Sequence, residues 1–196
     1  MRAAGVPEWY IGSCKKIAYL FPKAHAVAYV MMAFRIAWFK VHHPLAFYAA
    51  YFYRRSQKGG FDAVMMTQGM EAVKAHIAAI EANEKPSPKD EDMLTTLEVA
   101  YEYYLRGFEF LPIDIYESEA TRFRVIDGKL LPPFVAISGL GENAAWDIVK
   151  GRGKNKFLSI EEFSISCPKV SKTHIQMLKD AGAFGDLPDT SQVSFF

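Results

Sequence analysis

The longest apolar pattern in the chain runs from Tyr19 to Pro44, with the sequence YLFPKAHAVAYVMMAFRIAWFKVHHP. Pro22 suits the first position of a helix, and the run after it is rich in Ala and Met and has no Gly. Four residues recur at helical spacing and so share one face: His25, Tyr29, Met32 and Ile36. Pro44 disfavours helical backbone in the residue before it. We therefore predict a helix that begins near Pro22 and is broken at Pro44.

Three roles are open to this helix: a membrane span, a buried core helix, or a helix that presents charge to a ligand. Its longest uncharged run, residues 26–34, has nine residues, whereas a membrane span needs roughly 18 to 20. The run length therefore argues against a membrane span. The Ala, Met and aromatic positions after Ala26 are expected to build the core, while Lys23 and His25 at the start place charge near a ligand.

A second apolar run follows at residues 45–55, and two further helices are predicted at residues 61–83 and 88–107. Ser87 is the expected N-cap of the last one, with Pro88 at its first position and Asp90 at its third. Residues 112–118 and 121–134 alternate between apolar and polar as short strands do, and Asp127-Gly128 is typical of a hairpin turn. The chain is therefore predicted to be mainly α with a small β element.

The segment Leu131–Gly153, LPPFVAISGLGENAAWDIVKGRG, has the pattern of a helix-hairpin-helix DNA-binding element. A short helix leads to Gly139-Leu140-Gly141, and a second helix starts at Asn143. The glycines allow a tight turn, and the N–H groups that open the second helix can hold a DNA phosphate. Four basic residues follow and can neutralise further phosphates: Lys150, Arg152, Lys154 and Lys156. The alternative is a plain turn between packed helices, and the basic run favours DNA.

A second, degenerate copy follows in FSISCPKVSKTHIQMLKDAGAFG, with Lys169 and Lys172 at its hairpin. It lacks the two glycines, so both a DNA-binding and a purely structural role are open to it. The chain ends in DLPDTSQVSFF, a polar tail with two terminal aromatic residues. Such a tail is typical of a linear motif that inserts aromatic anchors into a partner. Folding of Phe195 and Phe196 back onto the core is the alternative.

The net charge of +1 hides a strong asymmetry along the 196 residues. Residues 1–58 carry nine Lys and Arg against Glu8 alone, whereas residues 59–127 carry six basic residues against fourteen acidic ones. A basic block of this kind attracts polyanions. The two cysteines, Cys14 and Cys167, lie far apart without a metal-binding spacing, and no apolar signal-peptide stretch precedes Pro7. We expect a cytoplasmic protein.

Several residues that resemble metal ligands or catalytic groups have simpler explanations. Asp90 and Asp92 have the spacing of a metal-binding pair, but they lie in the first turn of a capped helix, where acidic residues offset the helix dipole. The remaining histidines lack the spacing of a helical zinc pair. No phosphate-binding loop, nucleophile elbow or dinucleotide fingerprint is present. We therefore predict no metal site and no catalytic residue in this chain.

The segment Pro7–Phe52 closely resembles the fingers of the PolC-type α subunit of bacterial replicative DNA polymerase III, above all in its FPKAHAVAY block. The order of the later parts agrees: LLPPFVAISGLGENAAWDIV resembles that family's helix-hairpin-helix, VSKTHIQMLKDAGAFGDLPD its following segment, and QVSFF its clamp-binding peptide. The resemblance covers essentially the whole chain. This chain differs from the family in the clamp-binding peptide, which ends in Phe-Phe where the family usually has Leu before the last Phe.

The resemblance implies roles for particular residues. Five residues of the fingers would contact the incoming nucleotide: Phe21, Lys23, His25, Tyr29 and Arg35. Ten would contact primer-template DNA: Gly139, Leu140, Gly141, Asn143, Lys150, Arg152, Lys154, Lys156, Lys169 and Lys172. Four would bind the sliding clamp: Gln192, Ser194, Phe195 and Phe196. The family polymerises deoxynucleotides with Mg²⁺ held by palm aspartates.

No segment here resembles that palm, so the chain is expected to be the C-terminal portion of a longer polymerase and to be inactive alone. Its partners would be DNA, the nucleotide, the clamp and the rest of the polymerase, without a membrane. We expect three parts: a fingers region at 1–127, a tandem helix-hairpin-helix module at 128–186, and a flexible clamp-binding tail at 187–196. The alternative is a non-catalytic DNA-binding or clamp-associated protein that uses the same elements.

Overall fold

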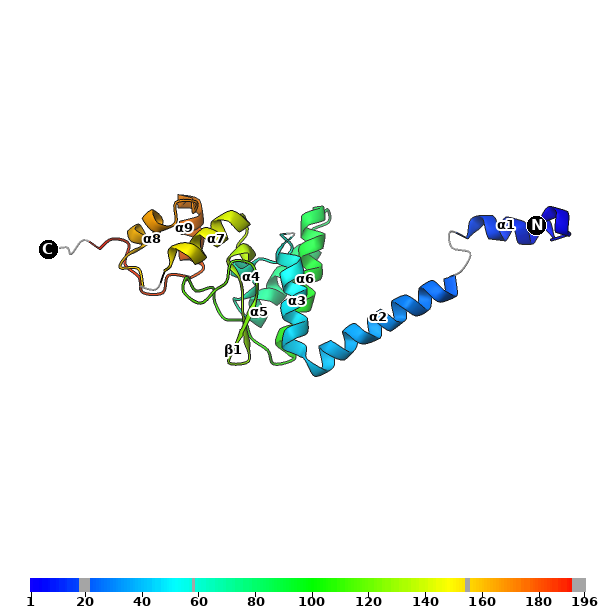
Figure 1. Ribbon diagram of the computed structural model, residues 1–196, viewed down its shortest axis with the longest axis horizontal. Helices are drawn as coiled ribbons and strands as arrows, with labels where there is room; N and C mark the ends of the chain where they lie inside the picture. The colour runs from blue at the N-terminus through cyan, green and yellow to red at the C-terminus, as the bar shows by residue number, and fades with distance from the viewer. Residues whose placement is uncertain (18–21, 58, 154–155, 192–196) are drawn as a thin grey trace. The chain divides into compact units, whose positions relative to one another are not determined.

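The computed structural model describes residues 1–17, 22–57, 59–153 and 156–191 (Figure 1). It divides into two compact units, Met1–Pro44 and Leu45–Phe196. The division falls at the proline that the sequence predicts to break the first long helix. The predicted boundary between residues 127 and 128 falls in the turn of a β-hairpin in the second unit, and the three predicted parts stay a prediction.

The first unit consists of the 3-10 turn η1 (Arg2–Ala4) and the helices α1 (Glu8–Lys16) and α2 (Pro22–His42). Helix α2 confirms the predicted start at Pro22. Its apolar side chains do not form a core within this unit, because Tyr29 and Phe34 are 67% and 73% exposed. The expectation that positions after Ala26 are buried is therefore wrong for the unit by itself. The described residues of this unit include one buried apolar side chain, Ile11, so the unit has almost no core of its own.

Helix α2 also has the length and composition of a membrane span. An 18-residue window within residues 23–42 reaches a mean hydropathy of 1.2, and none of that window is buried. The short uncharged run in the sequence did not indicate this, because Arg35 and Lys40 interrupt the run while the other residues of the window keep its average at 1.2. One such helix is weak evidence for a membrane.

Helix α3 (Pro44–Ser56) starts at the division between the units, and α4 (Ala63–Met66) and α5 (Met70–Glu81) follow in the second unit. The single helix predicted at residues 61–83 is thus two helices. Gly69 separates them with a φ of 100°, which is a backbone conformation that helices exclude and that glycine adopts without strain. Asp62 caps α4, since its carboxylate accepts a hydrogen bond from Met65 N at 3.3 Å.

Helix α6 (Pro88–Leu105) begins as the sequence predicts. The Ser87 hydroxyl accepts from Asp90 N, and the Asp90 carboxylate accepts from Ser87 N at 3.0 Å, which completes a capping box. The Ser87 hydroxyl also donates to the Asp90 carboxylate at 2.7 Å, and this bond, followed by the one from Ser87 N, lowers the pKa of Asp90. Asp90 is therefore a helix-capping residue.

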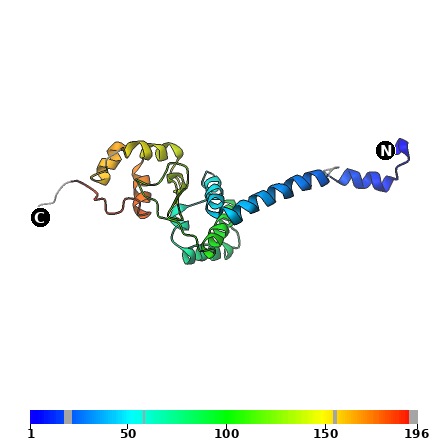
Figure 2. The same ribbon diagram turned by 60° about the horizontal axis from the view of Figure 1, so that its bottom comes forward.

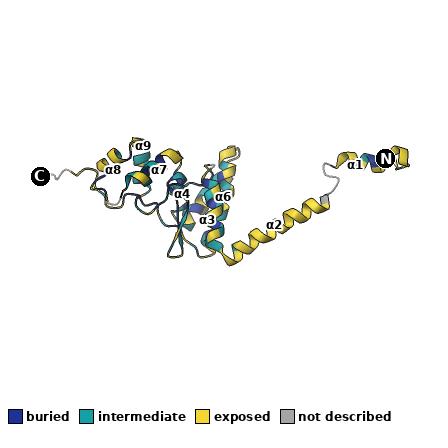
Figure 3. Ribbon diagram, viewed as in Figure 1, coloured by how far each residue is buried: buried dark blue, intermediate teal, exposed yellow. Residues whose placement is uncertain are grey.

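Aromatic side chains form the centre of the second unit. Phe52 from α3, Tyr103 from α6, and Phe61 and Phe110 from the loops are buried, with ring centroids of Tyr103 and Phe110 only 4.6 Å apart. The Phe52 and Phe61 rings lie 5.1 Å apart. Burying several large rings together contributes strongly to stability. Figure 3 shows the buried residues concentrated in this unit.

A two-stranded antiparallel sheet follows, made of β1 (Arg124–Ile126) and β2 (Lys129–Leu131). Asp127 and Gly128 form its turn with φ values of 48° and 78°, which confirms the predicted hairpin. Residues 112–118 do not form the predicted strand. Instead, the Asp114 carboxylate accepts hydrogen bonds from Tyr116 N at 2.7 Å and Glu117 N at 2.8 Å, which makes a turn.

The C-terminal part consists of the 3-10 turn η2 (Phe134–Ala136) and the helices α7 (Glu142–Gly151), α8 (Ile160–Ser166) and α9 (Lys172–Asp180). The three helices stay together in both views (Figure 2). Their inner residues join the same hydrophobic cluster as the aromatic centre. The fold is mainly α with a small β element, as the sequence predicts.

Candidate nucleic-acid interface

The turn between η2 and α7 has the geometry of a tight hairpin. Gly139 has a φ of 84°, which a residue with a side chain rarely adopts. Leu140 is 3% exposed, so it anchors the turn in the core, and its amide donates to Ile137 O at 3.1 Å. The Gly139 backbone and the Leu140 anchor therefore define the shape of the hairpin.

Gly141 is the N-cap of α7 and needs no special backbone conformation, because its φ is −72°. A Cβ placed on it would meet nothing within 4 Å. The cap has no side chain that could accept from the first-turn amides, and such amides are commonly left to water, a side chain or a ligand. The next residues, Glu142 and Asn143, are exposed. The start of α7 therefore has open space beside its capping glycine.

The hairpin before α9, which is the second, degenerate copy, makes hydrogen bonds to the hairpin before α7 and to α7 itself. Ser171 caps α9 in a capping box with His174, whose Nδ1 accepts from Ser171 N at 3.3 Å. That contact leaves Nε2 as the protonated nitrogen of the neutral ring, and it donates to Gly139 O at 3.1 Å. Lys169 N donates to the Asp147 carboxylate of α7 at 2.8 Å. The degenerate copy thus has a structural role in addition to any contact with DNA.

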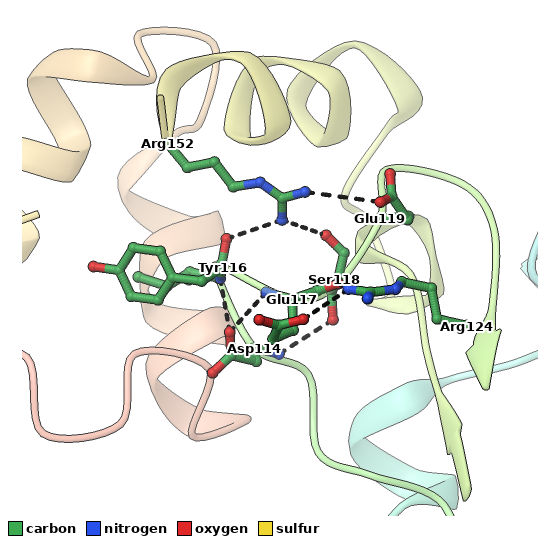
Figure 4. Close-up of polar contacts among 8 residues, drawn as sticks. Asp114, Tyr116, Glu117, Ser118, Glu119, Arg124 and Arg152 are labelled. Atoms are coloured by element: carbon green, nitrogen blue, oxygen red, sulfur yellow. Dashed lines mark hydrogen bonds and ion pairs between the residues drawn. The ribbon is translucent and has the colours of Figure 1, made fainter. Parts of the chain in front are cut away.

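Arg152 follows α7 and is turned into the protein (Figure 4). Its guanidinium donates to Ser118 O at 2.7 Å and to Ile115 O at 3.4 Å, and it lies 3.9 Å from a Glu119 carboxylate oxygen. Its side chain is only 16% exposed. These contacts occupy the donors that the sequence assigned to DNA, so Arg152 ties α7 to the turn at residues 114–119.

The other basic residues of this region differ in their surroundings. Lys150 is exposed in the last turn of α7, and Lys172 is exposed at the start of α9. The Lys156 ammonium lies 5.5 Å from the centroid of the Tyr116 ring, a cation–π distance that still leaves the residue exposed. Lys154 lies outside the described residues. Exposed ammonium groups on this side of α7 are suited to neutralising phosphates.

The residues assigned to the nucleotide lie on α2 in the first unit, apart from Phe21, which lies outside the described residues. His25 and Tyr29 are one helical turn apart, with ring centroids separated by 4.5 Å. Lys23 is two residues before His25 and so lies on a different face of the helix. The Arg35 guanidinium contacts Met32 Sδ at 4.0 Å. All four side chains are exposed, and they do not converge on one point of α2.

The four clamp-binding residues, Gln192, Ser194, Phe195 and Phe196, also lie outside the described residues. Within the part of the chain that is described, no group of three or more His, Cys, Asp or Glu side chains is arranged to hold a metal ion. Asp92 forms an ion pair with Arg55 at 2.8 Å. Both carboxylates of the Asp90–Asp92 pair therefore have structural partners.

Comparison with known proteins agrees with this arrangement. A family model described as a helix-hairpin-helix motif matches residues 107–192. The whole chain is 47% identical over 196 residues to the DNA polymerase III PolC-type of Thermotoga maritima. It is 49% identical over 197 residues to the proteins of the same name from Caldanaerobacter subterraneus subsp. tengcongensis and Bacillus subtilis. The chain spans 14% of the length of each of these relatives.

Proposed function

Since the chain belongs over its whole length to the PolC-type DNA polymerase III sequences, as a segment of them, we propose that it binds the DNA duplex for a replicative polymerase. The observation that carries this proposal is the hairpin at Gly139–Gly141, where Gly141 caps α7 without a side chain and has open space beside it. Amides at a helix start hold a phosphate without reading the base sequence. A replicative polymerase must bind DNA in this sequence-independent way.

The exposed basic residues around the hairpin complete the proposed contact. Lys150 and Lys156 follow it in sequence, and Lys169 and Lys172 lie at the second hairpin, with Lys154 added from the sequence pattern. Arg152 is left out because its guanidinium binds backbone carbonyl groups. Each phosphate that a lysine neutralises releases a counterion, so affinity should fall steeply with salt.

A titration of primer-template DNA across a salt series tests this function. We expect the plot of log affinity against log salt to have a negative slope, and the double variant Lys150→Ala/Lys156→Ala to make it shallower by about 2. Lys74→Ala/Lys85→Ala is the matched control, because it removes two exposed lysines away from the hairpin. Absent or salt-independent binding would contradict the proposal.

For the first unit we propose contact with the incoming nucleotide through Lys23, His25, Tyr29 and Arg35, together with Phe21. An ammonium and an imidazole at a helix start suit a triphosphate, and an aromatic ring suits a base. The test is to measure KM and kcat for polymerisation by a full-length PolC-type enzyme that carries the Lys23→Ala substitution at the corresponding position. We expect a higher KM for the nucleotide; an unchanged KM and kcat would exclude Lys23 from the site.

We also propose that residues 192–196 bind the sliding clamp. Pull-down of the chain on immobilised clamp, with and without these residues, tests the assignment. Equal recovery would refute it. The double substitution of Phe195 and Phe196 by Ala is expected to match the deletion, because paired aromatic anchors carry most of the energy of such peptides.

The proposed function also implies Mg²⁺, which other parts of the polymerase would hold. The polymerase reaction uses metal ions to stabilise the attacking and leaving oxygens, and the described residues offer no cluster of ligands for them. We therefore propose that the metal is held by segments of the polymerase other than this one, and that this segment alone does not polymerise. A cytoplasmic location follows from the same proposal, since bacterial chromosomal DNA is replicated there.

A further inference from the structure

Three adjoining hollows flank the hairpin in the second unit. The first, of about 650 Å³, lies between the start of α6 and the hairpin, and the second, of about 370 Å³, lies on the other side of Leu140 and Gly141, which line both. The third, of about 680 Å³, shares Thr121 and Glu142 with the second. Because neighbouring hollows share lining residues, we group the three as one surface beside the hairpin. We call it the hairpin groove.

One end of the hairpin groove is suited to a phosphate. Lys89 from α6 is exposed and lines the same hollow as Gly139 and Gly141. Asp92 also lines this hollow, but its charge is offset by the ion pair with Arg55 at 2.8 Å. The groove therefore presents an ammonium group beside the open backbone of the hairpin.

The other end is suited to a base. It is lined by Tyr53 and Trp146, and Trp146 is 42% exposed. The indole Nε1 donates to a Glu142 carboxylate oxygen at 3.2 Å, which holds the ring at the groove. Arg122 and Arg124 line this end together with two glutamates, Glu119 and Glu142, so its charges balance and it has no excess attraction for phosphate. An exposed aromatic face in such surroundings stacks on bases of any sequence.

The distance between the two ends matches a nucleic-acid strand. Trp146 follows Gly141 by five residues on α7, a rise of about 7.5 Å along the helix. Successive nucleotides of one strand advance by about 3.4 Å in a duplex. A strand that leaves the duplex at the hairpin and keeps this stacked spacing therefore places a base about two steps from the phosphate, near Trp146.

We propose that a single strand of DNA lies along the hairpin groove, with a phosphate at Lys89 and the hairpin amides and an unpaired base stacked on Trp146. This inference rests on the proposed duplex contact at the hairpin and goes beyond it. It assigns two further residues, and it specifies the substrate as DNA in which a duplex joins a single strand. Base pairing would keep the base in the duplex stack, so the Trp146 contact requires an unpaired nucleotide.

Fluorescence of the full 196-residue chain tests the contact with Trp146. The background variant Trp9→Phe/Trp38→Phe leaves Trp146 as the only tryptophan, since the chain has three. Duplex DNA with a single-stranded overhang is expected to quench its emission, whereas blunt duplex is not. Equal quenching by both, or by neither, would overturn the assignment of an unpaired base.

Affinity measurements test the energetic consequence. Trp146→Leu is expected to lower the preference for overhang over blunt duplex by about fivefold or more, while Trp146→Phe, which keeps an aromatic face, retains it. Lys89→Ala should make the salt slope shallower by about 1. Lys85→Ala is the matched control, because it removes an exposed lysine from the turn before α6 without touching the groove.

The outcomes separate this inference from the proposed function. If duplex binding depends on salt but Trp146→Leu keeps the preference for overhang over blunt duplex, the single-strand proposal is wrong. The proposed duplex contact at the hairpin would still hold. If the unsubstituted chain does not bind DNA, both the proposed function and this inference are wrong. A melting curve for each variant checks the fold, and the fluorescence comparison, which keeps Trp146, remains a valid test if Trp146→Leu is unstable.

Discussion

At the scale of single residues, two basic residues that are close in the sequence have different structural roles. Lys150 and Arg152 are two residues apart in one basic run, yet Lys150 is exposed and Arg152 is held by two backbone carbonyl groups. Their place in the basic run predicts the same role for both. The difference arises because residues 114–119 fold back beside the end of α7, a contact between segments far apart in the sequence.

The two residues should therefore respond oppositely to substitution. Arg152→Ala removes hydrogen bonds from a charged donor to Ser118 O and Ile115 O and should lower the free energy of unfolding by about 2–3 kcal/mol. Lys150→Ala should leave that free energy nearly unchanged and weaken DNA binding. Urea denaturation and DNA titration of both variants check this. Equal stability of the two variants would refute the structural role of Arg152.

Gly151 is a second residue whose role depends on a distant contact. A Cβ on Gly151 would lie 2.5 Å from Cys167 Sγ and 2.8 Å from Ser166 O. Gly151→Ala should therefore destabilise the protein by about 1–3 kcal/mol, although Ala favours helices over Gly. Thermal denaturation measures the loss. Adding Cys167→Ala should recover part of it, and a Gly151→Ala protein as stable as the parent would show that α7 and α8 separate easily.

At the scale of elements, caps and turns account for most of the local structure. The capping box at Ser87 and the turn at Asp127-Gly128 follow from residues adjacent in the sequence. The break at Gly69 depends on a local glycine as well, but an isolated glycine is compatible with a helix. The hairpin before α7 combines both situations: Gly139 determines the turn locally, while His174 of α9 binds its carbonyl group from a distance.

The start of α7 offers a substitution that separates stability from binding. Gly141→Ser places a good capping residue where the φ is −72° and open space lies ahead. The serine hydroxyl can accept from the first-turn amides, so stability should be unchanged or slightly higher. The same hydroxyl competes with a phosphate for these amides, so DNA affinity should fall. Melting curves and DNA titrations check the two effects, and tighter DNA binding would contradict the proposed contact.

At the scale of the whole molecule, the two units differ in how they are stabilised. The second unit packs its aromatic side chains and the C-terminal helices into one hydrophobic cluster. This burial raises the pKa of Tyr104 to about 12 and that of Cys167 to about 11, in both cases chiefly because the charged form is desolvated. The pKa of Tyr103 is raised for the same reason.

Alkaline pH should therefore destabilise the second unit. The unfolded chain loses these protons at lower pH than the folded one, so stability is complete below about pH 9 and falls as pH rises through the raised pKa values. Urea denaturation at increasing pH measures the decline. Tyr104→Phe should make it less steep, whereas Tyr10→Phe, in the first unit, should not. A rise in stability with alkaline pH would contradict the burial of these groups.

Much of the candidate site can be predicted from the amino-acid sequence. The glycine hairpin, the following basic run and the resemblance of the whole chain identify the helix-hairpin-helix region, which the family match confirms. Sequence reasoning misses Lys89 and Trp146 as candidates, because they lie on different helices and only the fold places them along one groove. The roles of Lys23, His25, Tyr29 and Arg35 stay predictions.

The sequence by itself determined the features that short-range chemistry controls: the start of α2 at Pro22, the cap of α6, the β-hairpin turn and the hairpin before α7. Proline, glycine and capping side chains act on backbone groups within a few residues. The tertiary structure alone decided that Arg152 is held inside the protein, that Gly151 must stay small, and that the apolar side chains of α2 are exposed in their own unit. Each of these depends on which distant segment packs beside the residue, and residue spacing carries no information about that.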